Sequence, residues 1–376
     1  MKIRISSVLA LLLAIALCVG LAACAKTGNN EDENLTYGFA LEEDLEETEE
    51  LDENPDKDID RATEPILQNV MTRLDGQPVR SDAYLYRELL SDNYKQAYDL
   101  IRAGIAEGKK EIYLTVPVAK ADIKTIYRSV YYDGPDLFWM EGGYSYAYNN
   151  YGNVTKVVPK YNALASDIAG NRAAFENALS AALADMWSLS DATSKVKYAH
   201  DYLISTIEYD YNAVYNQSAY SAVVNKKSVC AGYSRAFQYM MQKMDIRCGF
   251  IAGTCVTSSG SGGHAWNIVE LDGEYYAMDV TWDDPIGASA GKFYYNYFNV
   301  TDASISNNHI RGDVSGKLPA AIGTAKTFAA AFGGNQYGTD FDAVQGALPA
   351  GYGEASTVLI GGAAQPDDVT DNPYLP

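Results

Sequence analysis

Three side chains in this sequence have the types and surroundings that thiol chemistry requires: Cys230, His264 and Asp279. A thiolate is a strong nucleophile, a histidine can take up and return a proton near neutral pH, and a carboxylate can hold that imidazole in one tautomer and orientation. Brought together, the three would support acyl transfer. The thiolate attacks an amide carbonyl, the imidazole protonates the leaving amine, and water or a second amine resolves the thioester.

The segment after Cys230 is predicted to form an amphipathic helix. Apolar side chains recur there at helical spacing and turn one stripe of the helix toward a core: Tyr233, Phe237, Met240, Met241 and Met244. Cys230 then lies at the helix N-terminus, where unpaired backbone N–H groups and the helix dipole favour a thiolate and should lower the thiol pKa. Cysteines also start helices for packing reasons alone, so this segment by itself leaves a catalytic and a structural interpretation open.

His264 and Asp279 fall on either side of Asp272-Gly273, which joins two runs of alternating apolar and polar residues. Asp-Gly between such runs is the strongest short signal for a β-hairpin with a two-residue turn. In that register Trp266 lies opposite Asp279, so His264 and Asp279 become diagonal neighbours on one face. Trp282 would lie on the other face, as a core residue. The hairpin would therefore bring the imidazole and the carboxylate within reach of each other.

The other histidines offer no comparable arrangement in the sequence. The chain has three histidines, of which His200 lies in an expected helix and His309 in an asparagine-rich loop, and neither has an evident acidic partner. A zinc site is not suggested either, because C-x-x-C spacing is missing among the candidate ligands Cys230, Cys248, Cys255 and His264. We therefore expect no metal and no cofactor.

The segments that carry these residues resemble the bacterial transglutaminase-like superfamily. Its three motifs occur in order as CAGYSRAF from Cys230, GHAWN from Gly263 and MDVTWDDP from Met278. The match spans about residues 190–311 and includes flanking landmarks at 199–203, 209–211 and 297–300. The resemblance implies a papain-like α+β fold, in which a helix bearing the cysteine packs on an antiparallel sheet bearing the histidine and the aspartate.

By that resemblance Cys230 is the nucleophile, His264 the general base and acid, and Asp279 the orienting carboxylate. The leading hypothesis is an enzyme that transfers or hydrolyses peptide or protein amides. A papain-type peptidase is the nearest rival among enzymes, because it shares the order of cysteine, histidine and carboxylate. The alternative outside enzymes is a non-catalytic binding or scaffold module, since the superfamily includes members of that kind.

An acyl-transfer site also needs donors for the oxyanion that forms in the transition state. The backbone N–H of Cys230 is one candidate, and a side chain upstream of the helix is expected to supply the second. Gln217 and Tyr220 are the candidates, although Gln217 could equally cap or hydrogen-bond a loop. The glycine-rich residues 260–263 are expected to form a flexible loop before His264, which either gates the cleft or merely connects strands.

The first residues resemble a bacterial lipoprotein signal. Lys2 and Arg4 precede an apolar run at 8–19 that is too short to span a bilayer as a helix. The run leads to Leu-Ala-Ala-Cys ending at Cys24, which resembles a lipobox and implies removal of residues 1–23 and lipid attachment to the Cys24 thiol. A secretory signal without lipid is the alternative. We expect a lipid-anchored protein on the extracytoplasmic face of the cell membrane, with peptide or protein amides there as substrates.

The negative charge of the chain is concentrated in one short segment. The formal net charge is -20, and residues 31–60, with fifteen Asp or Glu and one Lys, supply -14 of it. A run of like charges repels itself and stays extended, so residues 24–62 are expected to form a disordered acidic linker. Nucleic-acid binding is not expected, because it favours a basic surface.

After the linker we expect an α+β region at 63–190, the transglutaminase-like domain at 191–317 and an Ala/Gly-rich tail of loop or disorder at 318–376. No linker separates the first two regions, so they are expected to pack together. Periodicity and turn signals predict the following elements: helices at 81–108, 121–131, 168–189 and 191–208, and strands at 111–118 and around 138–151.

Cys248 and Cys255 flank a segment, 249–253, that is typical of a strand. An extended chain of this length would hold the two thiols too far apart for a disulfide. We therefore expect both thiols to be free and buried.

Overall fold

The computed structural model describes residues 47–51, 71–257, 260–284 and 293–333. All of these residues belong to one unit, 37–376. The signal segment 1–23 and the lipidation residue Cys24 lie outside the described residues, as does the tail after residue 333.

Four antiparallel strands form the sheet that carries the candidate site. The strands β7 (Cys248–Thr257), β8 (Gly260–Leu271), β9 (Glu274–Met278) and β10 (His309–Arg311) are arranged in the order β10-β7-β8-β9. Asp272 and Gly273 have φ angles of 52° and 84°, as a type I′ turn requires. The predicted hairpin and its register are confirmed as far as the pair Asn267–Met278.

The chain turns at Asp279, earlier than predicted. The N–H of Asp283 donates to the carbonyl oxygen of Asp279 at 3.3 Å. Oδ1 of Asp279 accepts from the N–H groups of Thr281 at 3.0 Å and Trp282 at 3.2 Å. This hydrogen-bonded turn ends the alternation of faces, so the prediction that Trp282 lies on the opposite face of the hairpin is wrong.

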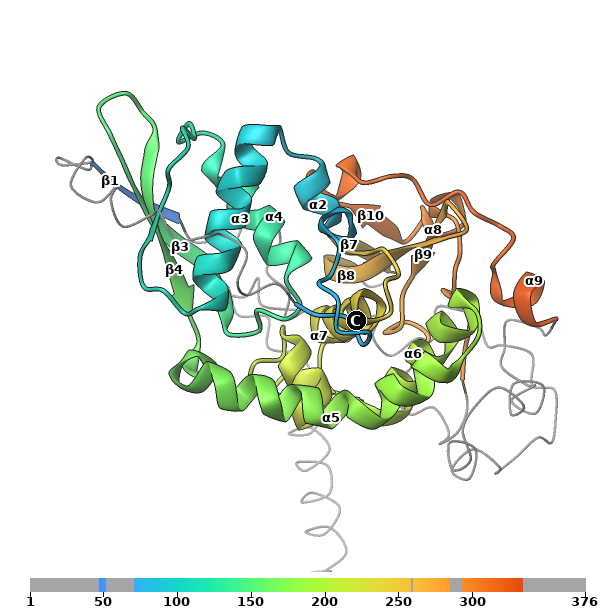
Figure 1. The fold of residues 1–376 in the computed structure, drawn as a ribbon. Coiled ribbons are helices and arrows are strands. Elements are labelled where there is room, and N and C mark those ends of the chain that lie inside the picture. The colour runs from blue at the N-terminus through green and yellow to red at the C-terminus, as the bar shows by residue number, and fades with distance from the viewer. Residues whose placement is uncertain (1–46, 52–70, 258–259, 285–292, 334–376) are drawn as a thin grey trace, which may run out of the picture. The chain divides into compact units, whose positions relative to one another are not determined.

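Helix α7 (Cys230–Lys243) packs on β7 and β8 and lies below β8 in Figure 1. Every residue of α7 is buried. The Asn267 Nδ2 group ties the sheet to the helix, because it donates to the carbonyl oxygens of Ser234 at 3.0 Å and Gly249 at 3.3 Å. The structure thus confirms the predicted helix, with Cys230 as its first residue.

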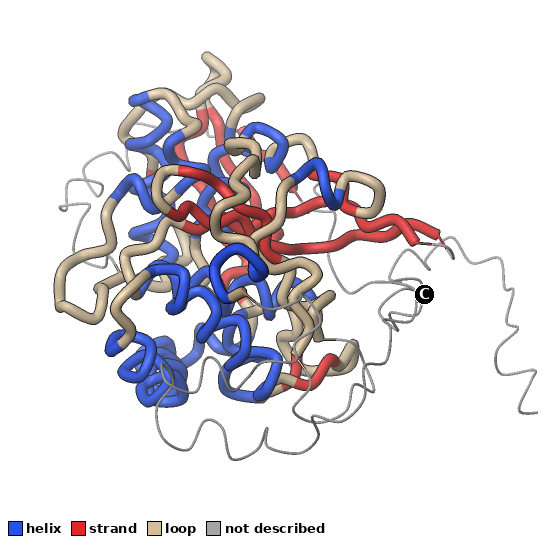
Figure 2. The backbone as a smooth tube through the Cα atoms, turned by 90° about the vertical axis from the view of Figure 1, so that its right-hand side faces the viewer, coloured by secondary structure: helices blue, strands red, loops and turns tan. Residues whose placement is uncertain are grey.

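Two helices precede α7 and agree with the prediction. They are α5 (Ile168–Ser188) and α6 (Ala192–Thr206), and α6 contacts both α5 and α7. Figure 2 shows the strands crossing the middle of the unit with helices packed beneath them. A short parallel pair, β5 (Glu208–Tyr209) and β6 (Lys227–Ser228), brings the chain after α6 beside the start of α7.

A second four-stranded sheet, in the order β1-β3-β4-β2, belongs to the N-terminal region. Its strands are β1 (Glu47–Leu51), β2 (Ile112–Tyr113), β3 (Met140–Tyr148) and β4 (Val154–Tyr161). β1 falls within the segment predicted to be a disordered linker. This part of the segment is a strand instead, because it pairs in parallel with β3 and because Glu49 accepts a hydrogen bond from the Tyr146 hydroxyl at 2.7 Å.

The helix predicted at 81–108 is divided, whereas α4 (Ile123–Asp133) agrees with the helix predicted at 121–131. The chain forms a 3₁₀ turn (Ser81–Ala83), then α2 (Leu85–Glu88), and begins again as α3 (Asp92–Ala106). Asp133 explains why α2 begins separately from the 3₁₀ turn, because its carboxylate accepts from the first-turn N–H groups of Tyr86 at 3.2 Å and Arg87 at 2.9 Å. A tertiary contact here overrides the local periodicity.

The two regions share one hydrophobic core, so they pack together as expected. Tyr98 and Trp139 of the first region cluster with Phe237 of α7. The Gln238 side chain, also on α7, donates to the carbonyl oxygen of Tyr132 at 3.0 Å. The site helix is therefore held from both sides, by its own sheet and by the N-terminal region.

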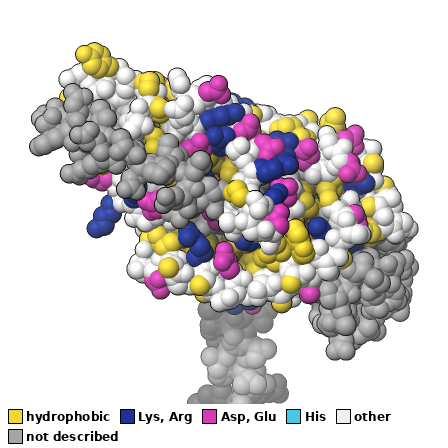
Figure 3. Space-filling view, viewed as in Figure 1, with side chains coloured by type: hydrophobic (Ala, Val, Ile, Leu, Met, Phe, Trp, Pro, Cys, Tyr) yellow, Lys and Arg dark blue, Asp and Glu magenta, His cyan; other side chains and the backbone are white. Residues whose placement is uncertain are grey.

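The chain after β9 contains two short helices, α8 (Asp302–Ile305) and α9 (Phe328–Phe332). α9 lies in the segment predicted to be loop or disorder, and its Phe328 ring stacks on Tyr295 with a centroid distance of 3.8 Å. Among the described helices, none is long and apolar enough to cross a membrane. On the face seen in Figure 3, acidic and basic side chains are interspersed.

Candidate active site

Cys230 lies at the N-terminus of α7, with only 2% of its surface exposed. Its N-cap residue, Val229, is extended and marks the point where the chain enters the helix. At this position the helix dipole and the first-turn N–H groups face the sulfur. The carbonyl oxygen of Asn216 accepts from the N–H of Val229 at 3.3 Å, so the upstream loop packs against the helix start.

His264 on β8 links the thiol to the carboxylate. Its Nε2 lies 2.6 Å from Oδ2 of Asp279, and the Cys230 thiol is close enough to the ring to affect its pKa. Because Nε2 is used by Asp279, Nδ1 is the nitrogen left for Cys230. The sequence predicted three residues in one constellation, and the structure brings all three together. A cysteine, an imidazole and a carboxylate connected in this order can perform thiol-dependent acyl transfer.

The charges in this chain of hydrogen bonds reinforce one another. Burial opposes the charged form of His264, but the Asp279 carboxylate, and then Cys230, raise the pKa of His264 well above its ordinary value. Burial likewise disfavours the Asp279 carboxylate, but His264 and His309 hold its pKa below its ordinary value. Asp279 is thus ionised and His264 keeps its proton at neutral pH.

The Asp279 carboxylate accepts four hydrogen bonds, of which only the one from His264 was predicted from the sequence. Its Oδ2, which already accepts from His264, is also 2.9 Å from Nε2 of His309. The statement that His309 lacks an acidic partner is therefore wrong. His309 is the first residue of β10 and pairs with Cys255 of β7. No local signal points to this contact, because β10 is short and pairs with a strand far upstream.

His309 is itself held in a polar and aromatic setting. Its Nδ1 lies 2.7 Å from Oδ1 of Asn308, whose Nδ2 donates to the Tyr297 hydroxyl at 3.0 Å. The ring lies 4.4 Å from the Trp282 ring and 5.3 Å from that of His264, measured between centroids. Burial, assisted by the nearby charge of His264, lowers the pKa of His309 below its ordinary value despite Asp279. His309 therefore donates to the Asp279 carboxylate through Nε2.

Two tryptophans enclose the imidazole of His264. The Trp266 ring stacks on it at 5.8 Å and the Trp282 ring lies at 5.4 Å, tilted by 38°. Both tryptophans are buried. Trp282 is thus a core residue, as predicted, but its ring packs against His264 instead of lying on the opposite face of the hairpin. Aromatic walls exclude water and strengthen the electrostatic interactions between the triad side chains.

His200 also has acidic partners, although none was expected from the sequence. Its Nδ1 lies 2.9 Å from Oδ1 of Asp201, and its Nε2 lies 3.2 Å from Oδ2 of Asp283. Asp283 in turn accepts from the N–H of Tyr297 at 3.1 Å. His200 and Asp283 are both fully buried, and the contact between them holds the turn that begins at Asp279. We assign His200 a structural role, because neither Cys230 nor any other thiol is among its hydrogen-bond partners in the described part of the chain.

Among the described residues, neither of the two side chains predicted as oxyanion donors is hydrogen-bonded to the triad. Tyr220 packs its ring against Phe138 with centroids 5.1 Å apart, and its hydroxyl donates to Oδ1 of Asn171 at 3.2 Å. Gln217 lines a separate cavity together with Arg235. The backbone N–H of Cys230 remains the candidate donor at the helix N-terminus.

Tyr211 is a further residue of the site that the sequence analysis considered only as a landmark of the superfamily. Burial raises the pKa of its hydroxyl, and the charges of Cys230, Cys255 and His264 also act on it, so the hydroxyl lies within electrostatic range of the triad. Tyr211 is 43% exposed, whereas the triad residues are buried.

The remaining cysteines are free and buried, as predicted. Burial raises the pKa of both Cys248 and Cys255. Cys255 lies next to the site, because it pairs with Gly262 on β8 and with His309 on β10. Residues 260–263 are consequently part of β8 rather than the loop that was expected.

The structure brings together three possible metal ligands, His264, Asp279 and His309. This set differs from the cysteine-containing set that was considered from the sequence. One donor atom each from His264, Asp279 and His309 lies within 4.8 Å of the others. Two histidines and one carboxylate are a known ligand set for transition metals. The same atoms, however, already form hydrogen bonds between the two imidazoles and Oδ2 of Asp279. The constellation is thus satisfied as a hydrogen-bonded one, and a metal would compete with these hydrogen bonds.

Comparison with known proteins supports a transglutaminase-like domain. Residues 181–280 match the model of the transglutaminase-like superfamily, and this range contains all three triad residues. His309 and the N-terminal region lie outside the match. Together with the helix-on-sheet arrangement, the match confirms the predicted α+β, transglutaminase-like core. No curated protein matches the chain.

Two solved structures share a remote similarity with this chain. A candidate cysteine protease from Cytophaga hutchinsonii is 13% identical with a TM-score of 0.27, and the similarity covers 48% of this chain and 58% of that one. A protein described as a TGase is 14% identical with a TM-score of 0.26, and the similarity covers 37% of this chain and 44% of that one. The chain thus spans less than two thirds of either protein.

Proposed function

We propose that this protein is a thiol-dependent enzyme that transfers or hydrolyses the acyl groups of peptide or protein amides outside the cytoplasm. The observation that carries the proposal is the grouping of Cys230, at the start of a buried helix, with His264, whose ring is hydrogen-bonded to Asp279. A domain that served only as a scaffold would not need an imidazolium placed between a thiol and an ionised carboxylate.

The reaction begins with the thiolate–imidazolium pair of Cys230 and His264. The sulfur attacks the amide carbonyl carbon, and the carbonyl oxygen becomes an oxyanion that the N–H of Cys230 can stabilise. Nδ1–H of His264 then gives its proton to the amine as the C–N bond breaks, leaving a thioester on Cys230. Water or a second amine attacks the thioester and passes its proton to Nδ1. The thiolate leaves, and the starting ion pair is restored.

Asp279 and His309 act on this reaction through His264. The Asp279 carboxylate keeps Nδ1 of His264 aimed at the sulfur, because it holds Nε2 on the other side of the ring. The hydrogen bond from His309 prevents Asp279 from turning away, since both histidines share Oδ2. The raised pKa of His264 gives it a proton to donate at neutral pH.

The location of the enzyme is the second part of the proposal. The basic start, the short apolar run and the lipobox-like sequence ending at Cys24 support secretion and a lipid anchor. The acidic segment at 31–60 would be repelled by an anionic membrane surface and would keep the folded unit away from it. Surface peptides or proteins are the substrates that fit this location.

The test compares the full chain with Cys230→Ala in a mixture of surface proteins and a biotin-labelled primary amine. Incorporation of the amine by the wild type alone would support a transferase, and new peptide termini without incorporation would support a hydrolase. The matched control is Cys248→Ala, which removes a buried thiol outside the triad and should behave as the wild type. If wild type and Cys230→Ala gave the same products, the enzyme proposal would be wrong and a binding module would be favoured.

A further inference from the structure

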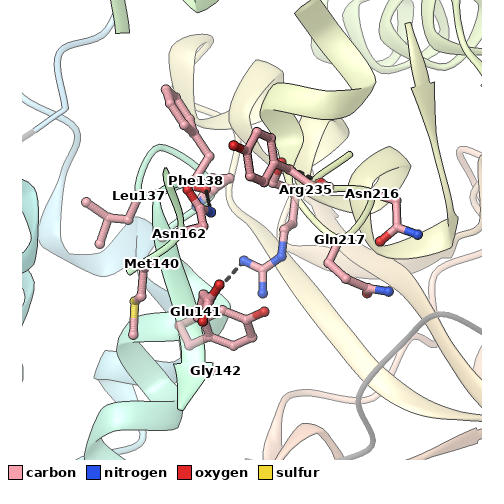
Figure 4. A pocket seen from close by; sticks show the side chains of 14 residues that line it. Leu137, Phe138, Met140, Glu141, Gly142, Asn162, Asn216, Gln217 and Arg235 are labelled. Carbon is pink, nitrogen blue, oxygen red and sulfur yellow. Dashed lines mark hydrogen bonds between the residues drawn. The ribbon is translucent and has the colours of Figure 1, made fainter. Parts of the chain in front are cut away.

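A second site lies beside the triad and uses the same helix. A cavity of about 280 Å³ is lined by residues of 131–142, by Asn162, by 215–218 and by Arg235 of α7. Figure 4 shows Arg235 pointing toward Glu141 and Gly142 across this cavity. Part of its wall is apolar, including Leu137, Phe138 and Met140. None of the three triad residues lines it.

Arg235 brings an uncompensated charge to the cavity. Its side chain is buried, and Nη1 donates to the carbonyl oxygen of Tyr131 at 2.7 Å. The guanidinium lies over the rings of Tyr131 at 4.2 Å and Phe250 at 4.5 Å. Nη2, also buried, has no hydrogen-bond partner within the described part of the chain. Burying a cation without an anionic partner is costly, so the cavity is suited to a ligand that supplies an anion.

Gln217 brings the second unsatisfied group. Its Oε1 is buried and has no hydrogen-bond partner among the described residues. Nearby polar groups of the wall are already engaged: Asn162 Nδ2 donates to the Phe138 carbonyl at 2.9 Å, and Ser218 Oγ donates to the Tyr215 carbonyl at 2.7 Å. The cavity therefore offers a charged donor from Arg235 and an amide acceptor from Gln217. A matching ligand supplies an anionic oxygen and an N–H group.

We propose that this cavity binds the carboxylate of an N-acylated amino acid, which is the chemical form of the C-terminal residue of a peptide. The carboxylate would accept from Nη2 of Arg235, the amide N–H would donate to Oε1 of Gln217, and an apolar side chain or acyl group would contact the apolar wall. A phosphate fits less well. Glu141 on the same wall would repel a dianion more strongly than a single carboxylate.

The position of this subsite relates it to the thiol. Arg235 follows Cys230 by five positions on α7, which corresponds to about 7.5 Å along the helix axis. An extended peptide covers about 3.3–3.6 Å per residue, so the distance corresponds to about two residues. If the proposed function holds, a peptide anchored by its terminal carboxylate would present an amide near its C-terminus to Cys230. Only this extension rests on the proposed function, whereas binding of the carboxylate does not.

Calorimetric titration of the full chain in detergent micelles tests the subsite. The probe is hippurate, which combines a carboxylate, an amide N–H and a phenyl ring, and its neutral control is hippuramide. We expect hippurate to bind at least tenfold more tightly than hippuramide. Arg235→Gln should weaken hippurate binding by about ten- to a hundredfold, and Gln217→Leu by about two- to tenfold. Arg172→Gln, which alters an arginine outside the cavity, and Cys230→Ala should bind as the wild type does.

The proposal is overturned if hippurate and hippuramide bind equally, or if neither binds at millimolar concentration. It is also overturned if Arg235→Gln, with an unchanged unfolding temperature, retains the wild-type affinity. Should Arg235→Gln fail to fold, Gln217→Leu and the comparison of the two probes decide the question. Normal binding by an inactive wild-type protein would leave this subsite standing and reject the enzyme proposal alone.

Discussion

One oxygen of Asp279 accepts hydrogen bonds from two histidines: Oδ2 lies 2.6 Å from Nε2 of His264 and 2.9 Å from Nε2 of His309. The other oxygen accepts from the N–H groups of Thr281 and Trp282. Four donors from two strands and one turn thus fix a single carboxylate. The orientation of the imidazole next to Cys230 depends on all of them.

His309→Phe should lower kcat/KM by roughly ten- to a hundredfold, because Asp279 loses one hydrogen bond to a charged group. The change should appear mainly in kcat, and the acid limb of the pH profile should move to higher pH as the pKa of Asp279 rises. His309→Gln, which can still donate, should recover part of the activity. An unchanged pH profile in a folded His309→Phe protein would show that His309 has no positioning role.

Cys230 should react with iodoacetamide at pH 6, because the raised pKa of His264 keeps an imidazolium beside the sulfur at that pH. Cys248 should stay unmodified in the folded protein, since burial excludes the reagent and raises the pKa of its thiol. Mass spectrometry of the modified peptides measures both. His264→Phe should abolish the fast reaction at pH 6, and equal rates for that variant and the wild type would contradict the ion pair.

Asp279→Asn should reduce turnover by roughly a hundredfold or more, because the imidazole loses the charge that stabilises its protonated form. The pKa of His264 is raised by Asp279, so its removal should lower that pKa. The loss of His264 protonation should then occur at lower pH in the variant. Titration of the His264 ring by NMR in both proteins provides the measurement, and a higher pKa in the variant would refute the assignment.

Asp133 should make the fold less stable as the pH rises. Burial raises its pKa to about 7, despite hydrogen bonds from the N–H groups of Arg87 and Tyr86. Its unfolded value is about 3.9, so the folded state holds the proton more tightly. The contribution of Asp133 to the free energy of unfolding is therefore greatest below pH ~4. It declines by about 4 kcal/mol as the pH rises toward 7.

Asp133→Asn removes this titration. The difference in free energy of unfolding between wild type and variant should therefore change by about 4 kcal/mol between pH 4 and pH 8. Denaturant unfolding at several pH values measures that difference, and other titrating groups cancel in it. A difference that does not change with pH would mean that Asp133 does not titrate in this range.

Zinc should inhibit the enzyme rather than activate it. A Zn²⁺ ion bound by His264, Asp279 and His309 would take the atoms that now form the hydrogen bonds of the triad. We expect inhibition at pH 8 that a chelator reverses, and a weaker effect in His309→Phe, which lacks one ligand. Activation by stoichiometric zinc would instead identify a metal centre.

Local signals in the sequence predicted the elements that carry the triad. The Asp272-Gly273 turn determines the hairpin register on its own, and the apolar stripe after Cys230 defines α7. Both signals depend on neighbouring residues only. The triad could be predicted because two of its residues share one hairpin and the third begins a strongly amphipathic helix.

The remaining features depend on contacts between distant segments. His309 reaches Asp279 through the pairing of β10 with β7, and the β5–β6 pair brings the segment of Tyr211 near the start of α7. The early end of β9 follows from the carboxylate of Asp279, which caps its own turn. Periodicity contains no information about such contacts, which is also why the division of the helix at 81–108 was missed.

The two-residue turn at Asp272 and Gly273 also determines which side chains of β8 and β9 share a face of the sheet. Side chains along a strand alternate between faces, so an insertion that shifted the pairing of β9 by one residue would exchange its faces relative to β8. Asp279 would then point away from His264 although every residue of the triad was still present. Loss of function in a relative could thus arise from a change in loop length, without any substitution among the reacting groups.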